Sequence, residues 1–301
     1  MELIQKTYFN FIEWRKMAFV LSGLLIVASI ISLVYQGLNF GIDFSGGTLI
    51  QLRFKQPAPV HEIRTELAKM DLGDVVIQEF GSANEILIRL EKQEVDPQKQ
   101  SKMAQELVEH IRPLPGGADL ELRRVEYVGP QVGQELTTKG LLAVLYSIIA
   151  ILIYVAWRFE FRFALGAVLA LVHDVIITVG YFSIMQKEFT LVVVAAVLTV
   201  IGYSINDTIV VFDRIREEMK RMKKQPLDLI INTAINETLS RTIITSLTVV
   251  LVLVALLLFG GEVIFDFALA LFLGIVVGTY SSIFIASPIV YLFEKKTIPQ
   301  P

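Results

Sequence analysis

The chain has 301 residues, of which 54% are hydrophobic and 19% charged, and its mean hydropathy is +0.60. A soluble globular protein is usually about 45–50% apolar, so this composition indicates a membrane protein. The formal net charge of −3 gives no reason to expect nucleic acid as a partner. Because cysteine is absent, disulfides, thiolate metal sites and cysteine nucleophiles are excluded, and the spacing of His61, His110 and His173 predicts no metal pair.

Six apolar runs predict transmembrane helices, because each has the roughly twenty residues that a helix needs to cross ~30 Å of hydrocarbon. The first follows Lys6, Arg15 and Lys16 and lacks a good cleavage site, so residues 1–36 are expected to form the N-terminus and an uncleaved first span. The remaining five spans are expected within residues 135–293. The runs are 17–35, 137–157, 163–185, 190–212, 241–260 and 265–293.

Basic residues predict the orientation of these spans. They gather at the N-terminus, after the second run, in the segment 213–240 and in the tail 294–301. By the positive-inside rule these regions are cytoplasmic, and so are both termini. Within 213–240 an apolar stripe predicts a helix that begins near Pro226. A position at the membrane interface is favoured over a role in docking a partner.

Residues 37–134 are polar and charged, and they are too long for a turn, so a folded domain outside the cytoplasm is expected. Its pattern predicts the order βαββαβ, which is that of a split βαβ, ferredoxin-like unit. The overall expectation is a membrane all-α six-helix bundle with an inserted α+β extracytoplasmic domain. The predicted strands are 48–54, 75–80, 85–90 and 120–127, and the predicted helices are 60–70 and 97–111.

Motifs of soluble enzymes are missing from the sequence. It contains no GxxxxGK[ST] loop for nucleotide phosphates, no HExxH zinc pair and no GxSxG nucleophile turn. We therefore predict that the protein is not an enzyme and that any work it performs takes its energy from elsewhere.

Ionisable residues at membrane depth are the candidates for function, since they are costly there and normally face a bundle interior or a water path. His173 and Asp174 lie ~15 Å into the third span, near the midplane. Two interpretations remain open for them, a proton relay and a structural hydrogen-bonded pair.

Asp207 lies in the fourth span, ~9 Å from its cytoplasmic end, among the polar residues Ser204, Asn206 and Thr208. We favour a carboxylate that picks up and releases a proton. The alternative is a carboxylate that only joins two helices by hydrogen bonds.

Arg241 opens the fifth span. It is an anchor that snorkels to the cytoplasmic surface, or, if its helix begins near Thr233, a buried counter-ion of Asp207. The sequence leaves both interpretations open.

Two further groups are expected to be structural. Asp213 and Arg214 are predicted to form the solvated end of the fourth span. Asp43, with the turn glycines Gly46 and Gly47, is predicted to organise a turn just outside the first span.

Several motifs carry a resemblance to a known family. They are GIDFSGGT at 41–48, VGPQVGQEL at 128–136, ALVHDVIIT at 170–178, VIGYSINDTIVVFDRIRE at 200–217, LSRTIITS at 239–246 and LFGG at 258–261. In this order they resemble the SecD/SecF family of protein-export membrane proteins of the RND superfamily, and the His-Asp and Asn-Asp pairs resemble its SecF branch.

The resemblance implies half of an RND-type bundle that SecD completes in the bacterial cytoplasmic membrane. It also implies association with the SecY-E-G channel, often with YajC, and a functional link with the SecA ATPase. Such a complex would use the proton gradient to draw preproteins outward late in translocation. Asp207 and Arg241 match the family residues linked to proton passage, no cofactor is implied, and Na⁺ stays open as the coupling ion.

Two other functions compete with this expectation. A small-molecule exporter of the RND type would usually carry two six-span halves and two large outer domains in one chain. A scaffold that stabilises the translocon would explain the fold without using Asp207, and it predicts that neutralising Asp207 leaves export intact.

Overall fold

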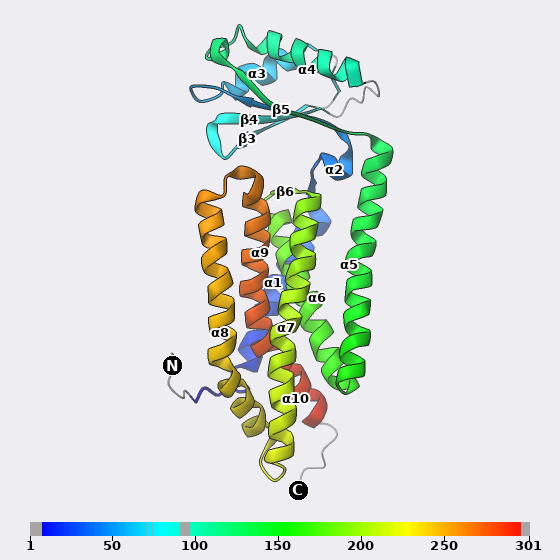
Figure 1. The fold of residues 1–301 in the computed structure, drawn as a ribbon, viewed down its shortest axis with the longest axis vertical. Helices are drawn as coiled ribbons and strands as arrows, with labels where there is room; N and C mark the ends of the chain where they lie inside the picture. Colours follow the sequence, from blue (N-terminus) through cyan, green and yellow to red (C-terminus); the bar gives the residue numbers. More distant parts are fainter. Residues whose placement is uncertain (1–7, 71, 74, 91–96, 296–301) are drawn as a thin grey trace. The chain divides into compact units, whose positions relative to one another are not determined.

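The computed structural model describes residues 8–70, 72–73, 75–90 and 97–295. The chain divides into a helical unit, Met1–Asn39 with Leu142–Pro301, and an α/β unit, Phe40–Leu141 (Figure 1). The predicted inserted domain was 37–134. Of the basic residues used to orient the chain, Lys6 lies outside the described residues, and so do 296–301 of the predicted cytoplasmic tail.

Long helices dominate the helical unit, and six of those described are long and apolar enough to cross a membrane. This confirms the predicted number of spans. The α9 helix continues through a π-helical turn, Ser282–Ala286, into α10, and the three form one candidate span. The helices are α1 (Arg15–Tyr35), α5 (Pro130–Arg158), α6 (Phe161–Ile184), α7 (Leu191–Arg221), α8 (Leu227–Phe259), α9 (Glu262–Ser281) and α10 (Ser287–Lys295), with the two-residue strand β6 (Glu188–Phe189) between α6 and α7.

Glycines on α9 allow close packing against α7. A Cβ atom at Gly274 would overlap the side chain of Val200 on α7, and one at Gly278 would lie 3.0 Å from Cβ of Ser204. Two glycines four residues apart lie on one face of a helix, and such a pair lets two membrane helices approach closely. The polar side chains that follow on α7 and α9 are therefore within hydrogen-bonding reach of each other.

The segment 213–240 differs from its prediction as a loop with a separate interface helix. The α7 helix runs to Arg221 and α8 begins at Leu227, so most of the segment extends two spans. No glycine or proline interrupts the sequence from Leu227 to Arg241, which lets one helix continue. The apolar stripe packs into the core of the bundle, through Ile231, Ala234 and Ile235, and not onto a membrane surface.

The α/β unit contains the six predicted elements in order, with ends shifted by three residues at most. Its antiparallel strands have the order β3-β4-β2-β5. The strands are β2 (Gly47–Arg53), β3 (Val75–Phe80), β4 (Ser82–Leu90) and β5 (Glu121–Val128), the helices are α3 (Val60–Leu67) and α4 (Pro97–Ile111), and shorter elements are β1 (Asn39–Phe40), α2 (Ile42–Ser45) and a 3₁₀ turn (Gly117–Asp119).

Alternating residues of the sheet make the core of this unit. Ile50 and Leu52 on β2, with Ile86 and Ile88 on β4, are fully buried. They form one cluster with buried residues of the two helices, including Leu67 of α3. The period of two along each strand directs these side chains to one face, where the helices cover them.

Candidate functional site

Asp207 lies on α7 with 3% of its surface exposed. Its Oδ2 atom accepts a hydrogen bond of 3.3 Å from Oγ of Ser246 on α8. The same Oγ atom lies 2.8 Å from Oγ1 of Thr279 on α9, which donates to the carbonyl of Ile275 at 2.8 Å. A change in the charge of Asp207 would therefore act where α7, α8 and α9 meet.

Asp174 on α6 forms a second buried polar centre, and it is 1% exposed. Its Oδ1 atom is 2.8 Å from Nδ1 of His173. Its Oδ2 atom accepts from Oγ of Ser204 on α7 at 2.6 Å and from Oγ of Ser281 on α9 at 2.7 Å. The pair His173–Asp174 thus joins three helices through one carboxylate.

One face of α7 contributes to both centres: it carries Asp207 and the serine that bonds Asp174. Ser204, Asp207 and Thr208 are spaced at i, i+3 and i+4, which places them on neighbouring positions of the helix surface. Ser204 bonds Asp174, while Thr208 Oγ1 lies 2.9 Å from Oγ of Ser282 on α9. Two residues predicted to surround Asp207 therefore bond to other groups.

Helix α9 changes its hydrogen-bonding pattern at this site, since the π-helical turn begins at Ser282. Ser282 donates to the carbonyl of Gly278 at 2.9 Å, and Ser287 donates to the carbonyl of Ser282 at 2.9 Å. Single π-turns inside α-helices are frequent at functional sites, because they leave backbone groups for other partners. Here serine hydroxyls donate to backbone carbonyls before and within the turn.

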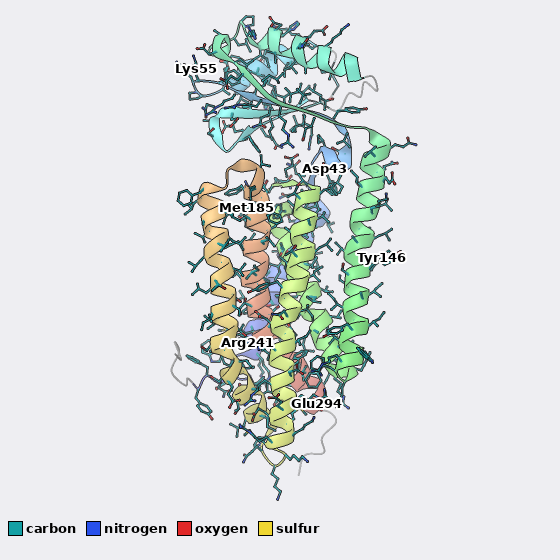
Figure 2. The ribbon with its side chains drawn as sticks, viewed as in Figure 1. Asp43, Lys55, Tyr146, Met185, Arg241 and Glu294 are labelled. Atoms are coloured by element: carbon teal, nitrogen blue, oxygen red, sulfur yellow. The ribbon has the colours of Figure 1, made fainter. Side chains whose placement is uncertain are left out.

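Arg241 lies inside α8, well past the start of that helix at Leu227 (Figure 2). Its side chain is exposed in this single chain, and no hydrogen bond or ion pair joins it to any residue that the structure describes. Asp207 is bonded by Ser246 instead. The pairing of Arg241 with Asp207 stays a prediction.

Asn206 is exposed on the surface of α7 and makes no hydrogen bond within the described part of the chain. It directly precedes buried Asp207, and adjacent residues of a helix point in different directions. The two members of the Asn-Asp pair therefore face different surroundings.

Asp213 and Arg214 do not end the fourth span, because α7 continues to Arg221. The carboxylate of Asp213 accepts from Arg158 of α5 at 3.0 Å. Arg214 donates to Glu237 of α8 at 2.6 Å, so it joins two helices. The prediction that they form the end of the helix was wrong, because α7 extends beyond the apolar run into a charged segment. Their side chains are nevertheless 40% and 31% exposed.

Asp43 lies in the first turn of the short helix α2, and Gly46 and Gly47 follow with φ angles of +71° and +115° (Figure 2). Such angles favour glycine, since other residues rarely adopt them. A Cβ atom at Gly133 would lie 2.8 Å from the carbonyl oxygen of Phe44, so the glycine lets the beginning of α5 approach α2 closely.

The sequence prediction missed four hydroxyl partners, Ser246, Thr279, Ser281 and Ser282. The signal that could have revealed three of them is a run of four hydroxyl residues, 279–282, in an otherwise apolar span. Among the described residues, no group of three or more His, Asp or Glu side chains could hold a metal ion.

Comparisons with known proteins agree on one family. The model "Protein export membrane protein SecD/SecF, C-terminal" matches residues 114–296, and the "SecD/SecF GG Motif" matches residues 31–58. The chain is 62% identical over 291 residues to the protein translocase subunit SecF of Magnetococcus marinus, covering 97% of this chain and 94% of that one. It is 51% identical to the SecF subunit of Calditerrivibrio nitroreducens, covering 98% and 97%.

A solved structure has the same fold. The crystal structure of SecDF, a translocon-associated membrane protein from Thermus thermophilus, matches with a TM-score of 0.86 and 37% identity. The match covers 96% of this chain but 39% of the SecDF chain, so the present chain corresponds to less than half of that protein.

Proposed function

Because the chain belongs to the SecD/SecF family of protein-export membrane proteins, we propose that it acts with SecD to couple the proton-motive force to late steps of preprotein translocation. A role in protein export follows from the family and from the SecF relatives. The coupling to a proton gradient goes further and rests on the chemistry of the bundle.

One observation carries the proposal: the carboxylate of Asp207 is buried between spans and bonded by a hydroxyl from a neighbouring span. A carboxylate in a low-dielectric interior is stable only with partners, and adding a proton changes which partners it needs. If the packed helices have two arrangements of similar free energy, protonation shifts the population between them. The result is movement powered by proton flow.

The partners are proposed from the family to which the chain belongs. A SecD subunit would supply the second half of the bundle, as the 39% coverage of the SecDF chain suggests. The complex would associate with the SecY-E-G channel, with YajC, and with preproteins that the SecA ATPase has already engaged. Exposed Arg241 would then face groups of SecD.

The location is proposed from the distribution of charge. The six spans lie in the bacterial cytoplasmic membrane, and both termini are cytoplasmic, because basic residues gather on one side. The α/β unit would then be extracytoplasmic. Its strand order β3-β4-β2-β5 supports a ferredoxin-like fold, in which two helices cover one face of the sheet.

We propose further that the protein is not an enzyme. Its energy source would be the proton gradient, since the sequence carries no nucleotide-binding loop. A sodium gradient is the alternative source, and imposing either gradient alone distinguishes the two.

Translocation in membrane vesicles tests the proposal. Vesicles contain SecD, the SecY-E-G channel and this chain as wild type or Asp207→Asn. SecA and ATP start translocation, ATP is then removed, and a proton gradient is imposed. Completed preprotein should accumulate with the wild type and fall at least tenfold with Asp207→Asn.

Asp228→Asn is the matched control, because Asp228 is an exposed carboxylate at the beginning of α8. It should behave as the wild type. Equal completion with Asp207→Asn, in a complex that assembles normally, would contradict the proton-driven function. The protein would then be a scaffold of the translocon.

A further inference from the structure

The two ring nitrogens of His173 have different surroundings. Nδ1 lies 2.8 Å from Oδ1 of Asp174. Nε2 is buried and has no hydrogen-bond partner among the described residues, and the whole side chain is 3% exposed. A buried polar atom without a partner is rare in native proteins and calls for an explanation.

The partners of Asp174 determine which nitrogen carries the hydrogen. Its Oδ2 atom already accepts from Ser204 and Ser281, and its Oδ1 atom faces Nδ1. The two hydroxyls are donors, as the partners of an ionised carboxylate must be, and such a carboxylate can only accept from Nδ1. Nδ1 of His173 therefore holds the hydrogen, and Nε2 of the neutral ring presents a lone pair.

The surroundings of the ring suit a positive charge. Its face stacks on Tyr280 of α9, with centroids 6.2 Å apart and planes inclined by 29°. Aromatic faces attract cations, and the Asp174 carboxylate supplies the opposite charge. Other ionisable groups on α6 and the helices packed against it include Asp207 on α7 and, at the beginning of α6, Arg162 paired with Glu294 of α10 at 2.9 Å.

We propose that His173 and Asp174 form a second proton-binding site, separate from Asp207, in which Nε2 of His173 takes up the proton. A proton from the solvent adds to the Nε2 lone pair, one N–H bond forms, and no other bond breaks. Release returns the same proton to the solvent. The use of this site in export rests on the proposed function, whereas proton uptake itself rests only on the contacts of this chain.

Ser281 transmits the change to α9. Its hydroxyl lies 2.7 Å from Oδ2 of Asp174 and 3.1 Å from the carbonyl of Gly278, so one hydrogen has two acceptors within reach. When His173 becomes positive, it draws the charge of Asp174 toward Nδ1, and the hydroxyl turns toward Gly278. This residue precedes the π-helical turn, where a small rearrangement alters the backbone pattern of α9.

Nitrogen-15 NMR of the complex with SecD in lipid nanodiscs tests the inference, with labelled histidine in this chain only. His61 and His110 lie in the α/β unit, and His61→Gln with His110→Gln leaves His173 as its one labelled histidine. At alkaline pH we expect a hydrogen on Nδ1 and none on Nε2. On acidification the signal of the unprotonated nitrogen should be lost as Nε2 gains a hydrogen.

Two results would overturn the proposal. One is an Nε2 atom that stays unprotonated at every pH at which the complex remains folded. The other is an Nε2 atom that is protonated throughout. Tyr280→Phe retains the aromatic face and should leave the titration unchanged, while Asp174→Asn removes the acceptor that fixes the tautomer and should produce a mixture of both tautomers. Should Asp174→Asn fail to assemble, the titration of the wild type still decides the question.

The same samples separate this inference from the proposed function. In Asp207→Asn the His173 titration should persist, although gradient-driven export is lost. If export is instead normal in Asp207→Asn while His173 still titrates, the proposed function fails and the second proton site stands. Ser281→Ala should retain the titration and lower gradient-driven export several-fold, because the proton is bound but α9 no longer responds.

Discussion

Ser204 lies three residues before Asp207 on α7, yet its hydroxyl is bonded to Asp174 on α6, 2.6 Å away. Asp207 itself is bonded by Ser246 of α8. One face of α7 thus contacts two separate carboxylate centres. Changes at either centre can be examined through partners that are not themselves charged.

Ser246→Ala should weaken gradient-driven translocation without abolishing it. The substitution removes the hydroxyl that donates to Asp207 and contacts Thr279. A hydrogen bond to a charged group contributes about 1.5–3 kcal/mol, so we expect a loss of roughly tenfold or more in the rate of completed translocation. Thr248→Ala is the control, because Thr248 is exposed on the same helix and bonds only the backbone of Thr245. Equal rates for the two variants would contradict a role for Ser246.

Gly274→Ala should destabilise the bundle. Its Cβ would overlap Val200 at the contact between α7 and α9, and overpacking of this kind costs about 1–3 kcal/mol. The measurement is the thermal unfolding midpoint of the complex with SecD in detergent. Gly202→Ala on α7 is the matched control, since no atom lies within 4 Å of its added Cβ. A midpoint for Gly274→Ala that equals that of the control would show that the helices can separate freely there.

Asn232→Ala and Asn236→Ala should release the segment before α1. Asn236 accepts from the amide of Phe9 at 3.0 Å and donates to its carbonyl at 2.9 Å. Asn232 accepts from the amide of Ile12 at 3.1 Å. Each truncation leaves backbone groups without a hydrogen-bond partner. Leaving such a group unpaired costs about 1–3 kcal/mol of stability where it is buried.

Hydrogen exchange of the amides of Phe9 and Ile12 measures this release. Both should exchange faster in the double variant, while amides in the middle of α6 keep their protection. Asn206→Ala is the control, because that asparagine makes no hydrogen bond within the described part of the chain. Unchanged exchange at Phe9 would contradict the anchoring.

The ion pair between Arg214 and Glu237 should stabilise the contact between the C-terminal part of α7 and the N-terminal part of α8 only modestly. Their side chains are 31% and 39% exposed, and partly exposed pairs contribute about 0.2–1 kcal/mol. A double-mutant cycle with Arg214→Gln and Glu237→Gln measures the coupling free energy of unfolding. It should fall as salt is raised, because solvent ions screen exposed charges. A coupling free energy well above about 1 kcal/mol that does not change with salt would show that the pair is not a weak, partly exposed one.

The sequence predicted the positions of helices and strands, because these depend on residues close together in the chain. The length of apolar runs predicted the spans, and the pattern of apolar residues predicted β3 and α4 with the bounds that the structure has. These signals lie in the local sequence, so they can be read without knowledge of tertiary contacts.

The partners of the buried carboxylates could not be predicted in this way. Ser281 and Asp174 are far apart in the chain, and their contact depends on the rotation of α9 and on how closely Gly278 lets it approach α7. Similarly, nothing local distinguishes a span that ends at Phe212 from one that continues to Arg221. The ion pairs of the extension include pairs within α7, such as Arg221 with Glu218, and others that depend on Glu237 of α8, which the local sequence does not place.

The unbroken course of α8 has a mechanical consequence. Asn232, which holds the N-terminal segment, and Ser246, which touches Asp207, are on one rigid rod about 21 Å apart. A tilt of about 5° at the carboxylate would displace the anchored end by about 2 Å. The segment before α1, which Asn232 holds, would then move with α8. A change in the charge of Asp207 would in this way displace the beginning of α1.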